Sequence, residues 1–160
     1  MFDYIHIKGI QSHLDTMIKF TPGLNVITGS TDVGKSTVMR AFLWTIKNKP
    51  SGDSLRNWYL DEDDEISSEI GINGQEVVKV RKNNSNFYLF GEHKFEALKT
   101  NVPSEIEEVF NLSDFNIQTQ HNPYCLINDS PGERARKLNE LVGLDVIDKL
   151  FKNLNSKIIS

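Results

Sequence analysis

A glycine-rich loop lies between a short apolar run and a helix-like periodicity near the N-terminus. Residues 29–36 read Gly-Ser-Thr-Asp-Val-Gly-Lys-Ser and match the G-x-x-x-x-G-K-[ST] pattern at every position. In such a loop, backbone N–H groups at the positive end of a helix surround phosphate oxygens, and a Cβ at either glycine would obstruct their approach. The pattern therefore predicts a phosphate-binding loop with a strand before it and a helix after it.

The last two residues of the pattern have side-chain roles in this chemistry. Lys35 is expected to reach the β- and γ-phosphates of a nucleotide, and the Ser36 hydroxyl is expected to ligate Mg²⁺. The rest of the loop is expected to cradle the phosphates with its backbone, and its residues are Gly29, Ser30, Thr31, Asp32, Val33 and Gly34. ATP and Mg²⁺ are therefore the expected cofactors.

Hydrophobic periodicity around the loop indicates an α/β fold. Leu24–Thr28 is a short apolar run that predicts a buried strand directly before the loop. Phe2–Ile7 and Thr16–Phe20 alternate in the manner of strands, so three strands are expected before the first helix. That helix is predicted from Ser36 to about Asn48, because two apolar stripes recur there at helical spacing and Pro50-Ser51-Gly52 ends them.

An antiparallel meander is expected in the middle of the chain. Asn73-Gly74 lies between Ile66–Ile72 and Glu76–Arg81, and this dipeptide between two strand-like runs favours a tight hairpin. Phe87–Phe90 follows a polar turn and predicts a further strand.

Two helices and one strand are predicted in the C-terminal part. A short helix is expected over Pro103–Phe110, and a strand over Phe115–Gln120. Ser130-Pro131-Gly132-Glu133 is a capping-box pattern, which predicts a helix that runs to about Val142. From Asp145 onward, apolar residues recur at steps of three and four, as at the start of a coiled coil.

The composition fits one intracellular domain. The chain has 160 residues, of which 38% are hydrophobic, and this is enough for one core. Lysine and arginine number 18 against 22 acidic residues, so no strong basic field marks a nucleic-acid binder, although a local groove is compatible with this balance. The single Cys125 cannot form an internal disulfide, and no apolar run has the length of a membrane span. We expect a cytoplasmic protein.

Three stretches, Ile7–His13, Pro22–Ile27 and the glycine-rich loop, together resemble the SbcC-type branch of the SMC-like ATPases. The relatives of these DNA-repair ATPases include the structural-maintenance-of-chromosomes, RecF and RecN proteins. The resemblance implies the N-terminal lobe of an ABC-type head, an α/β P-loop NTPase fold with a mixed sheet and an antiparallel meander. It also implies that residues 1–144 form the lobe and residues 145–160 begin a coiled-coil helix.

The same resemblance implies an activity and its residues. The head would bind ATP and, with a C-terminal lobe in a head dimer, hydrolyse it to drive DNA-end binding, repair or recombination, together with a nuclease partner. Lys35 and Gln120 would act in catalysis, Ser36 and Gln120 would ligate Mg²⁺, and Thr37 would support the α-phosphate. Gln118 is the alternative to Gln120. The Walker B and signature motifs are missing from this sequence, so we expect incomplete ATPase activity from this chain alone.

The chain departs from the family pattern in two places, and one stretch imitates a missing motif. Ser30-Thr31-Asp32 occupies the middle of the loop, where Pro-Asn-Gly is usual, and Gln11 stands where an arginine often assists phosphate binding. Tyr59-Leu60-Asp61-Glu62 superficially imitates a Walker B strand, but the charges on both sides favour a solvated acidic loop.

Other functions remain open at this point. The chain could be a non-catalytic P-loop module that docks on a partner ATPase or on DNA, or, less in keeping with its motifs, a small P-loop kinase. Three basic residues, Lys79, Arg81 and Lys82, are expected at a strand edge, where they either prevent aggregation or contact DNA phosphates.

Overall fold

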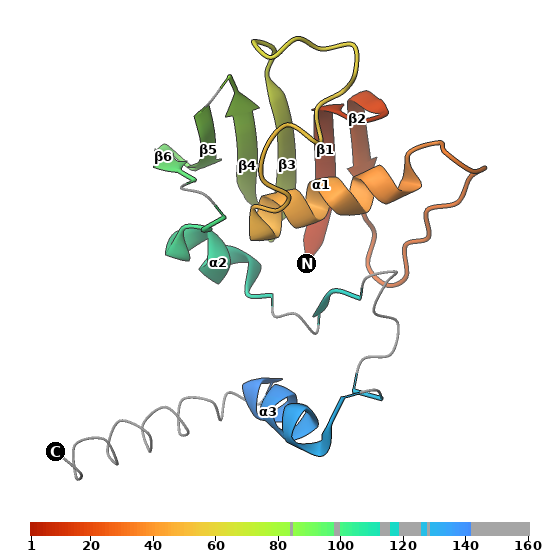
Figure 1. Ribbon diagram of the computed structural model, residues 1–160, viewed down its shortest axis with the longest axis vertical. Coiled ribbons are helices and arrows are strands. Elements are labelled where there is room, and N and C mark those ends of the chain that lie inside the picture. Colours follow the sequence, from red (N-terminus) through yellow and green to blue (C-terminus); the bar gives the residue numbers. More distant parts are fainter. Residues whose placement is uncertain (84, 98–99, 113–115, 119–125, 128, 142–160) are drawn as a thin grey trace, which may run out of the picture. The chain divides into compact units, whose positions relative to one another are not determined.

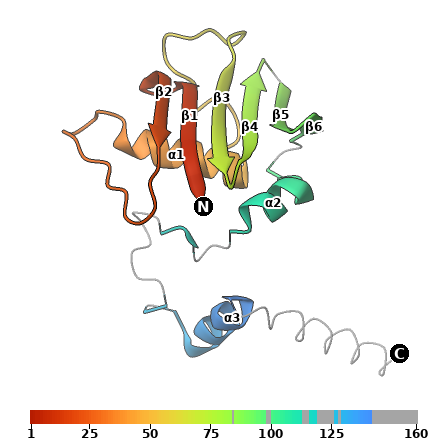
Figure 2. The ribbon, with the colours of Figure 1, turned by 180° about the vertical axis from the view of Figure 1, so that it is seen from behind.

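A computed structural model describes residues 1–83, 85–97, 100–112, 116–118, 126–127 and 129–141. The chain divides into two units, Met1–Asn111 and Leu112–Ser160, and each is described by itself. Figure 1 and Figure 2 show the first unit from opposite sides, as a sheet with one helix lying across one of its faces.

The sheet of the first unit is antiparallel throughout. Its strand order is β2-β1-β3-β4-β5-β6, and every neighbouring pair runs antiparallel. The strands are β1 (Phe2–Ile10), β2 (His13–Lys19), β3 (Ile66–Ile72), β4 (Gln75–Lys82), β5 (Ser85–Phe90) and β6 (His93–Glu96). Helix α1 (Lys35–Lys47) packs on β1, β3 and β4, and α2 (Ser104–Phe110) contacts α1. The predicted α/β lobe with an antiparallel meander is confirmed. The mixed sheet is wrong for the described residues, because each described strand pair is antiparallel.

Local signals position several of these elements as predicted. Asn73 and Gly74 have φ values of 51° and 75°, so both central residues of the β3–β4 hairpin are left-handed, as a type I′ turn requires. Helix α1 ends at Asn48, a left-handed C-cap residue whose N–H donates to the Trp44 carbonyl. Strand β6 is missing from the predicted elements, and the turn at Gly91 and Glu92 returns it alongside β5.

The core lies between α1, α2 and the sheet. Its fully or almost fully buried apolar side chains come from α1, α2 and the strands β1, β3, β4 and β5, and include Ile5, Ile7, Trp44, Ile66, Ile70 and Ile106. Burial of each large side chain contributes about 1.5–3 kcal/mol. Hydrogen bonds also join α1 to the sheet, since Thr45 Oγ1 donates to Ser68 Oγ at 2.8 Å and the Tyr88 hydroxyl donates to the Thr45 carbonyl at 2.9 Å. The helix that follows the glycine-rich loop is therefore fixed on the sheet.

The strand predicted at Leu24–Thr28 is not formed. This segment has no regular secondary structure and belongs to the orange stretch between β2 and α1 in Figure 1. Leu24 is 90% exposed and Val26 is 68% exposed. A strand needs a neighbour that pairs with its backbone N–H and C=O groups, and none of the six described strands pairs with this segment. The prediction is wrong for this chain by itself, because an apolar pattern does not supply the neighbour.

Lys79 lies in the core and not at a strand edge. Strand β4 has β3 and β5 on its two sides, so the predicted edge position is wrong. The Lys79 side chain is fully buried, with Nζ 3.8 Å from the ring centroid of Tyr88 and 5.7 Å from that of Trp44. Burial, with a contribution from the charge of Arg81, lowers the pKa of Lys79 to about 7. This ammonium is not available to DNA phosphates in the folded chain.

The second unit contains α3 (Pro131–Leu141), which begins at the predicted capping box. The Glu133 N–H donates to Ser130 Oγ at 3.3 Å, and the Ser130 N–H donates to Glu133 Oε2 at 3.0 Å. Residues 116–118 are not in a strand, so the strand predicted there is wrong for the part that the structure describes. Gln120, Cys125 and the predicted coiled-coil start at residues 145–160 lie outside the described residues. Like the other described helices, α3 lacks the length and apolar character needed to cross a bilayer.

Candidate nucleotide-binding site

The glycine-rich loop ends at the N-terminus of α1. Gly34 is the N-cap residue, and Lys35 and Ser36 are the first two residues of the helix. The first N–H groups of a helix have no acceptor within it, and the first turn of α1 carries no acidic side chain. The positive end of the helix is therefore directed at any anion that the loop holds.

Gly34 is enclosed by the turn between β1 and β2. A Cβ at this position would lie 2.3 Å from Ser12 Oγ and 2.6 Å from His13 Nε2, and the backbone φ of 94° also disfavours any other residue. His13 Nε2 lies 3.1 Å from the Gly34 carbonyl, and because a carbonyl only accepts, this nitrogen carries the proton. His13 Nδ1 lies 3.0 Å from Thr16 Oγ1, which orients the ring. The turn thus supports the loop from one side and accepts only glycine there.

Lys35 folds back over its own loop. Its Nζ donates to the Gly29 carbonyl at 2.9 Å and to the Ser30 carbonyl. Asp32 adopts a left-handed φ of 63°, a conformation that aspartate tolerates better than most residues. The ammonium therefore lies between the first residues of the loop and the helix, where the oxygens of a bound phosphate would meet it.

A second cation lies on the first turns of α1. Arg40 Nη1 donates to Gln11 Oε1 at 3.0 Å, and Thr37 Oγ1 donates to the same oxygen at 2.9 Å. Gln11 thus holds the guanidinium beside the hydroxyl that we expect near the α-phosphate. The sequence analysis missed Arg40, although its position four residues after Ser36 places both side chains on one face of the helix.

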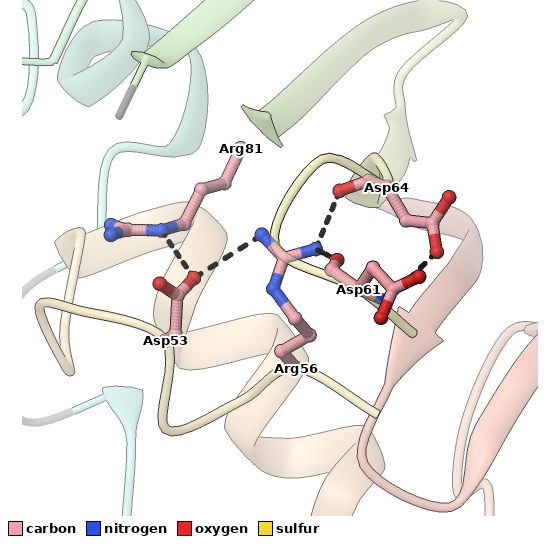
Figure 3. Close-up of polar contacts among 5 residues, drawn as sticks. All are labelled: Asp53, Arg56, Asp61, Asp64 and Arg81. Carbon is pink, nitrogen blue, oxygen red and sulfur yellow. Dashed lines mark hydrogen bonds and ion pairs between the residues drawn. The ribbon is translucent and has the colours of Figure 1, made fainter. Parts of the chain in front are cut away.

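Figure 3 shows how Arg56 organises the loop between α1 and β3. Its guanidinium donates to the carbonyls of Asp61, at 3.0 Å, and Asp64, and pairs with Asp53 Oδ1 at 3.3 Å. Arg81 Nε donates to the same Asp53 oxygen at 2.8 Å, which ties the loop to β4. The pKa of Asp53 is lowered by these two arginines against the opposing effect of its desolvation. The stretch that imitated a Walker B strand is an acidic loop, as expected.

Asn57 attaches the same loop to the end of β1. The Asn57 N–H donates to the Gly9 carbonyl at 2.9 Å, and its side-chain amide donates to the Gln11 carbonyl. The Gln11 N–H in turn donates to the Leu55 carbonyl at 2.8 Å. The side chain of Asn57 also accepts from the Tyr59 N–H at 2.9 Å. This loop, residues 53–64, is therefore fixed next to the turn that supports Gly34.

These three segments line one open cleft of about 970 Å³. The β1–β2 turn contributes Gln11 and Ser12, and the start of β2 contributes Leu14. The glycine-rich loop and α1 contribute Asp32, Gly34, Lys35, Ser36, Thr37 and Arg40, and the remaining lining residues belong to the 53–64 loop. The volume lies within the usual range for a small-molecule site. Two basic side chains on α1, a hydroxyl suited to a hard cation and the helix N-terminus match the needs of a Mg²⁺-bound polyphosphate.

Most of the predicted site residues come together in the first unit. Five of them, Asp32, Gly34, Lys35, Ser36 and Thr37, line the cleft. Gly29 and Ser30 hold the Lys35 ammonium. Gln118 is exposed in the second unit, whose position relative to the cleft is not defined, and Gln120 lies outside the described residues. The role of either glutamine stays a prediction.

A family model described as an AAA domain matches residues 4–158. The chain belongs to this AAA-domain family. This chain is similar to two proteins that are both named DNA double-strand break repair Rad50 ATPase. The one from Pyrococcus abyssi is 24% identical over 94% of this chain and 19% of its own length. The one from Archaeoglobus fulgidus is 24% identical over 96% of this chain and 18% of its own length. The AAA-domain chain thus spans about a fifth of each of these relatives.

A solved structure matches the fold of the AAA-domain chain. It comes from work described as structural biochemistry of ATP-driven dimerization and DNA stimulated activation of SMC ATPases. The TM-score is 0.67 at 18% sequence identity, and the match covers 88% of this chain and 98% of that chain. The fold is therefore that of an SMC ATPase head. Together with the family match and the Rad50 relatives, it confirms the expected likeness to the N-terminal lobe of SMC-like ATPases.

Proposed function

We propose that this chain binds Mg·ATP at residues 29–37 and forms one half of an ATPase head. The observation that carries the proposal is the junction at Gly34, where a turn from β1 and β2 leaves room only for glycine, next to Lys35 and the N-terminus of α1. The family and the fold both belong to ATPases, which supports this assignment.

The proposed binding mode gives each group in the cleft a task. Backbone N–H groups of residues 29–34 and the helix N-terminus hold the phosphates, and Lys35 neutralises the β- and γ-phosphates. Arg40 adds a second positive charge near Thr37 and the α-phosphate. Ser36, together with Gln120, ligates the Mg²⁺ that offsets the charge of the β- and γ-phosphate oxygens.

The exposed apolar segment before the loop supports an interaction with a partner lobe. Leu24, Val26 and Ile27 have the sequence of a buried strand, yet they are exposed in this chain. Next to them lies a largely apolar groove of about 360 Å³, lined by residues that include Phe2, Phe20, Ile27, Val38, Met39 and Phe42. Contiguous exposed apolar surface of this kind marks interaction sites. We propose that a C-terminal lobe, of the same or another chain, pairs with Leu24–Thr28 and covers this groove.

The remaining parts of the proposal concern the whole assembly. The names of the Rad50 relatives support a role in DNA repair, and the described work on the SMC structure supports a head dimer that closes with ATP and responds to DNA. A nuclease partner, an SbcC-type coiled coil after residue 144 and a cytoplasmic location complete the proposal.

Hydrolysis measurements test the division of labour between the two lobes. The purified 160-residue chain is expected to bind Mg·ATP but to release phosphate at no more than the rate of the Lys35→Ala variant. Turnover by this chain alone at the rate of a complete head would contradict the proposal that the hydrolytic half lies elsewhere. Phosphoryl transfer to a small acceptor would instead indicate a kinase, and docking on a partner without any nucleotide affinity would indicate a binding module.

A further inference from the structure

Trp58 and Tyr59 are the most exposed aromatic side chains in the described part of the chain. Trp58 is 94% exposed and Tyr59 is 91% exposed. Burial of a large aromatic side chain lowers the free energy of the folded protein. An adjacent pair of such side chains exposed to water is therefore unusual in a fold with its own core. Both residues line the cleft that also contains Lys35 and Arg40.

The backbone that carries this pair is fixed. Asn57 directly precedes it, is buried, and makes hydrogen bonds to Gly9 and Gln11. The Tyr59 N–H donates to the Asn57 side chain, and the Leu60 N–H donates to the Asn57 carbonyl at 3.1 Å. The aromatic pair is therefore presented to the cleft by a loop whose conformation is set before any ligand arrives, which lowers the entropy cost of binding.

The charges around Trp58 and Tyr59 favour an uncharged aromatic ring as their ligand over a nucleic-acid strand. The 53–64 loop carries acidic residues on both sides of Trp58 and Tyr59, among them Glu62, which lines the cleft. A DNA backbone would be repelled along this loop. Lys35 and Arg40 lie on α1, whereas Arg56, the cleft cation on the loop, forms an ion pair with Asp53. A ligand that places phosphates at the helix and an uncharged base at the loop therefore matches both ends.

We propose that Trp58 and Tyr59 form the nucleobase subsite of this cleft and stack on the base of a bound nucleoside triphosphate. The inference rests on the proposed function, because it takes the phosphates to lie at residues 29–35. Stacking reads the face of a base and tolerates any base. The subsite therefore adds affinity for ATP and GTP alike and adds none for a polyphosphate that lacks a base.

Calorimetric titration of the 160-residue chain tests this with two ligands, Mg·ATP and Mg·tripolyphosphate. In the double variant Trp58→Ala, Tyr59→Ala, the Kd for ATP is expected to rise about tenfold or more, while the Kd for tripolyphosphate stays unchanged. Met17→Ala, which removes an exposed apolar side chain outside the cleft, should change neither value. Unchanged ATP affinity in the double variant, or equal losses for the two ligands, would overturn the subsite.

Intrinsic fluorescence gives a second readout that needs no truncation of the ring. The chain has two tryptophans, of which Trp44 is 2% exposed and Trp58 is 94% exposed. ATP, but not tripolyphosphate, should quench the emission, and Trp58→Phe should remove this quenching while it keeps the affinity for ATP. Quenching that persists in Trp58→Phe, or quenching by single-stranded oligothymidine and not by ATP, would overturn the inference.

Failure of the proposed function has a different signature. If the wild-type chain binds neither ATP nor tripolyphosphate, both the proposed phosphate site and the proposed nucleobase subsite are contradicted. If it binds both ligands equally well, only the nucleobase subsite is contradicted, and the phosphate site is supported.

Discussion

Arg40 and Gln11 are joined by a hydrogen bond of 3.0 Å, from the guanidinium to the side-chain oxygen of the glutamine. Because Thr37 Oγ1 donates to the same oxygen, the neutral amide brings a positive charge to the cleft without neutralising it. A glutamate at position 11 would make the same contacts but would form an ion pair with the arginine.

We expect Gln11→Glu to weaken Mg·ATP binding although it preserves the geometry of the contact. The carboxylate lowers the net positive charge beside the phosphates, and a loss of about 1–2 kcal/mol is expected. Arg40→Gln should cost a similar amount and should flatten the salt dependence of binding. Titration calorimetry at two salt concentrations measures both effects. Gln75→Glu, at the exposed first residue of β4, is the matched control. Tighter binding in Gln11→Glu would contradict a role for Arg40 in holding phosphate.

Gly34 should be the least replaceable glycine in the site. Its φ of 94° is close to the φ of 96° at Gly23, but only Gly34 has atoms in the way of a Cβ, and nothing lies within 4 Å of a Cβ at Gly23. Gly23→Ala is therefore expected to cost about 1 kcal/mol from backbone strain alone. Gly34→Ala should cost about 2–4 kcal/mol, because Ser12 and His13 must also move.

Urea unfolding followed by circular dichroism separates these two glycines, and ATP titration of the folded variants completes the comparison. Gly34→Ala should lose nucleotide binding, whereas Gly23→Ala should retain it. Equal costs for the two substitutions would show that the β1–β2 turn does not press on the loop.

The parts of the fold that the sequence predicts correctly depend on short-range signals. Asn73-Gly74 sets its hairpin, and Ser130 and Glu133 begin α3 through contacts three residues apart. The loop at residues 29–36 likewise carries its own conformational requirements in its glycines. Such features need no knowledge of the rest of the molecule.

The parts that the sequence does not predict depend on neighbours far along the chain. Lys79 looks like a solvated strand residue until the sheet order places it under α1. Leu24–Thr28 looks like a core strand until the described sheet offers it no partner. The role that we propose for Trp58 and Tyr59 depends on the fold, which places their loop and the glycine-rich loop at the same cleft. These contacts are long-range, and no local pattern reports them.

The buried Lys79 should make the stability of the first unit depend on pH. Its pKa is lowered from an ordinary value of 10.5 to about 7 in the folded state. Between these two values the unfolded chain binds more protons than the folded chain, so the free energy of unfolding rises with pH through this window. The slope from this group is at most about 1.4 kcal/mol per pH unit, and it vanishes below the folded pKa.

Lys79→Met should remove this slope and raise stability at pH 7, because it keeps the buried stem and deletes the desolvated ammonium. Urea unfolding from pH 6.5 to 9.5 compares the two proteins, with Lys82→Met at the exposed end of β4 as the control. A variant that is less stable than the wild type at every pH would show that the contacts of Nζ with the Tyr88 and Trp44 rings outweigh its desolvation.

The most direct test of the central claim is Mg·ATP binding by the 160-residue chain, compared with its Lys35→Ala variant by isothermal titration calorimetry. The wild type should bind one nucleotide per chain. The variant, with the same unfolding midpoint, should bind at least tenfold more weakly, a difference of about 1.4 kcal/mol or more. Equal affinity in the two proteins, or no binding by the folded wild type, would contradict the assignment of the loop at residues 29–36 as a nucleotide site.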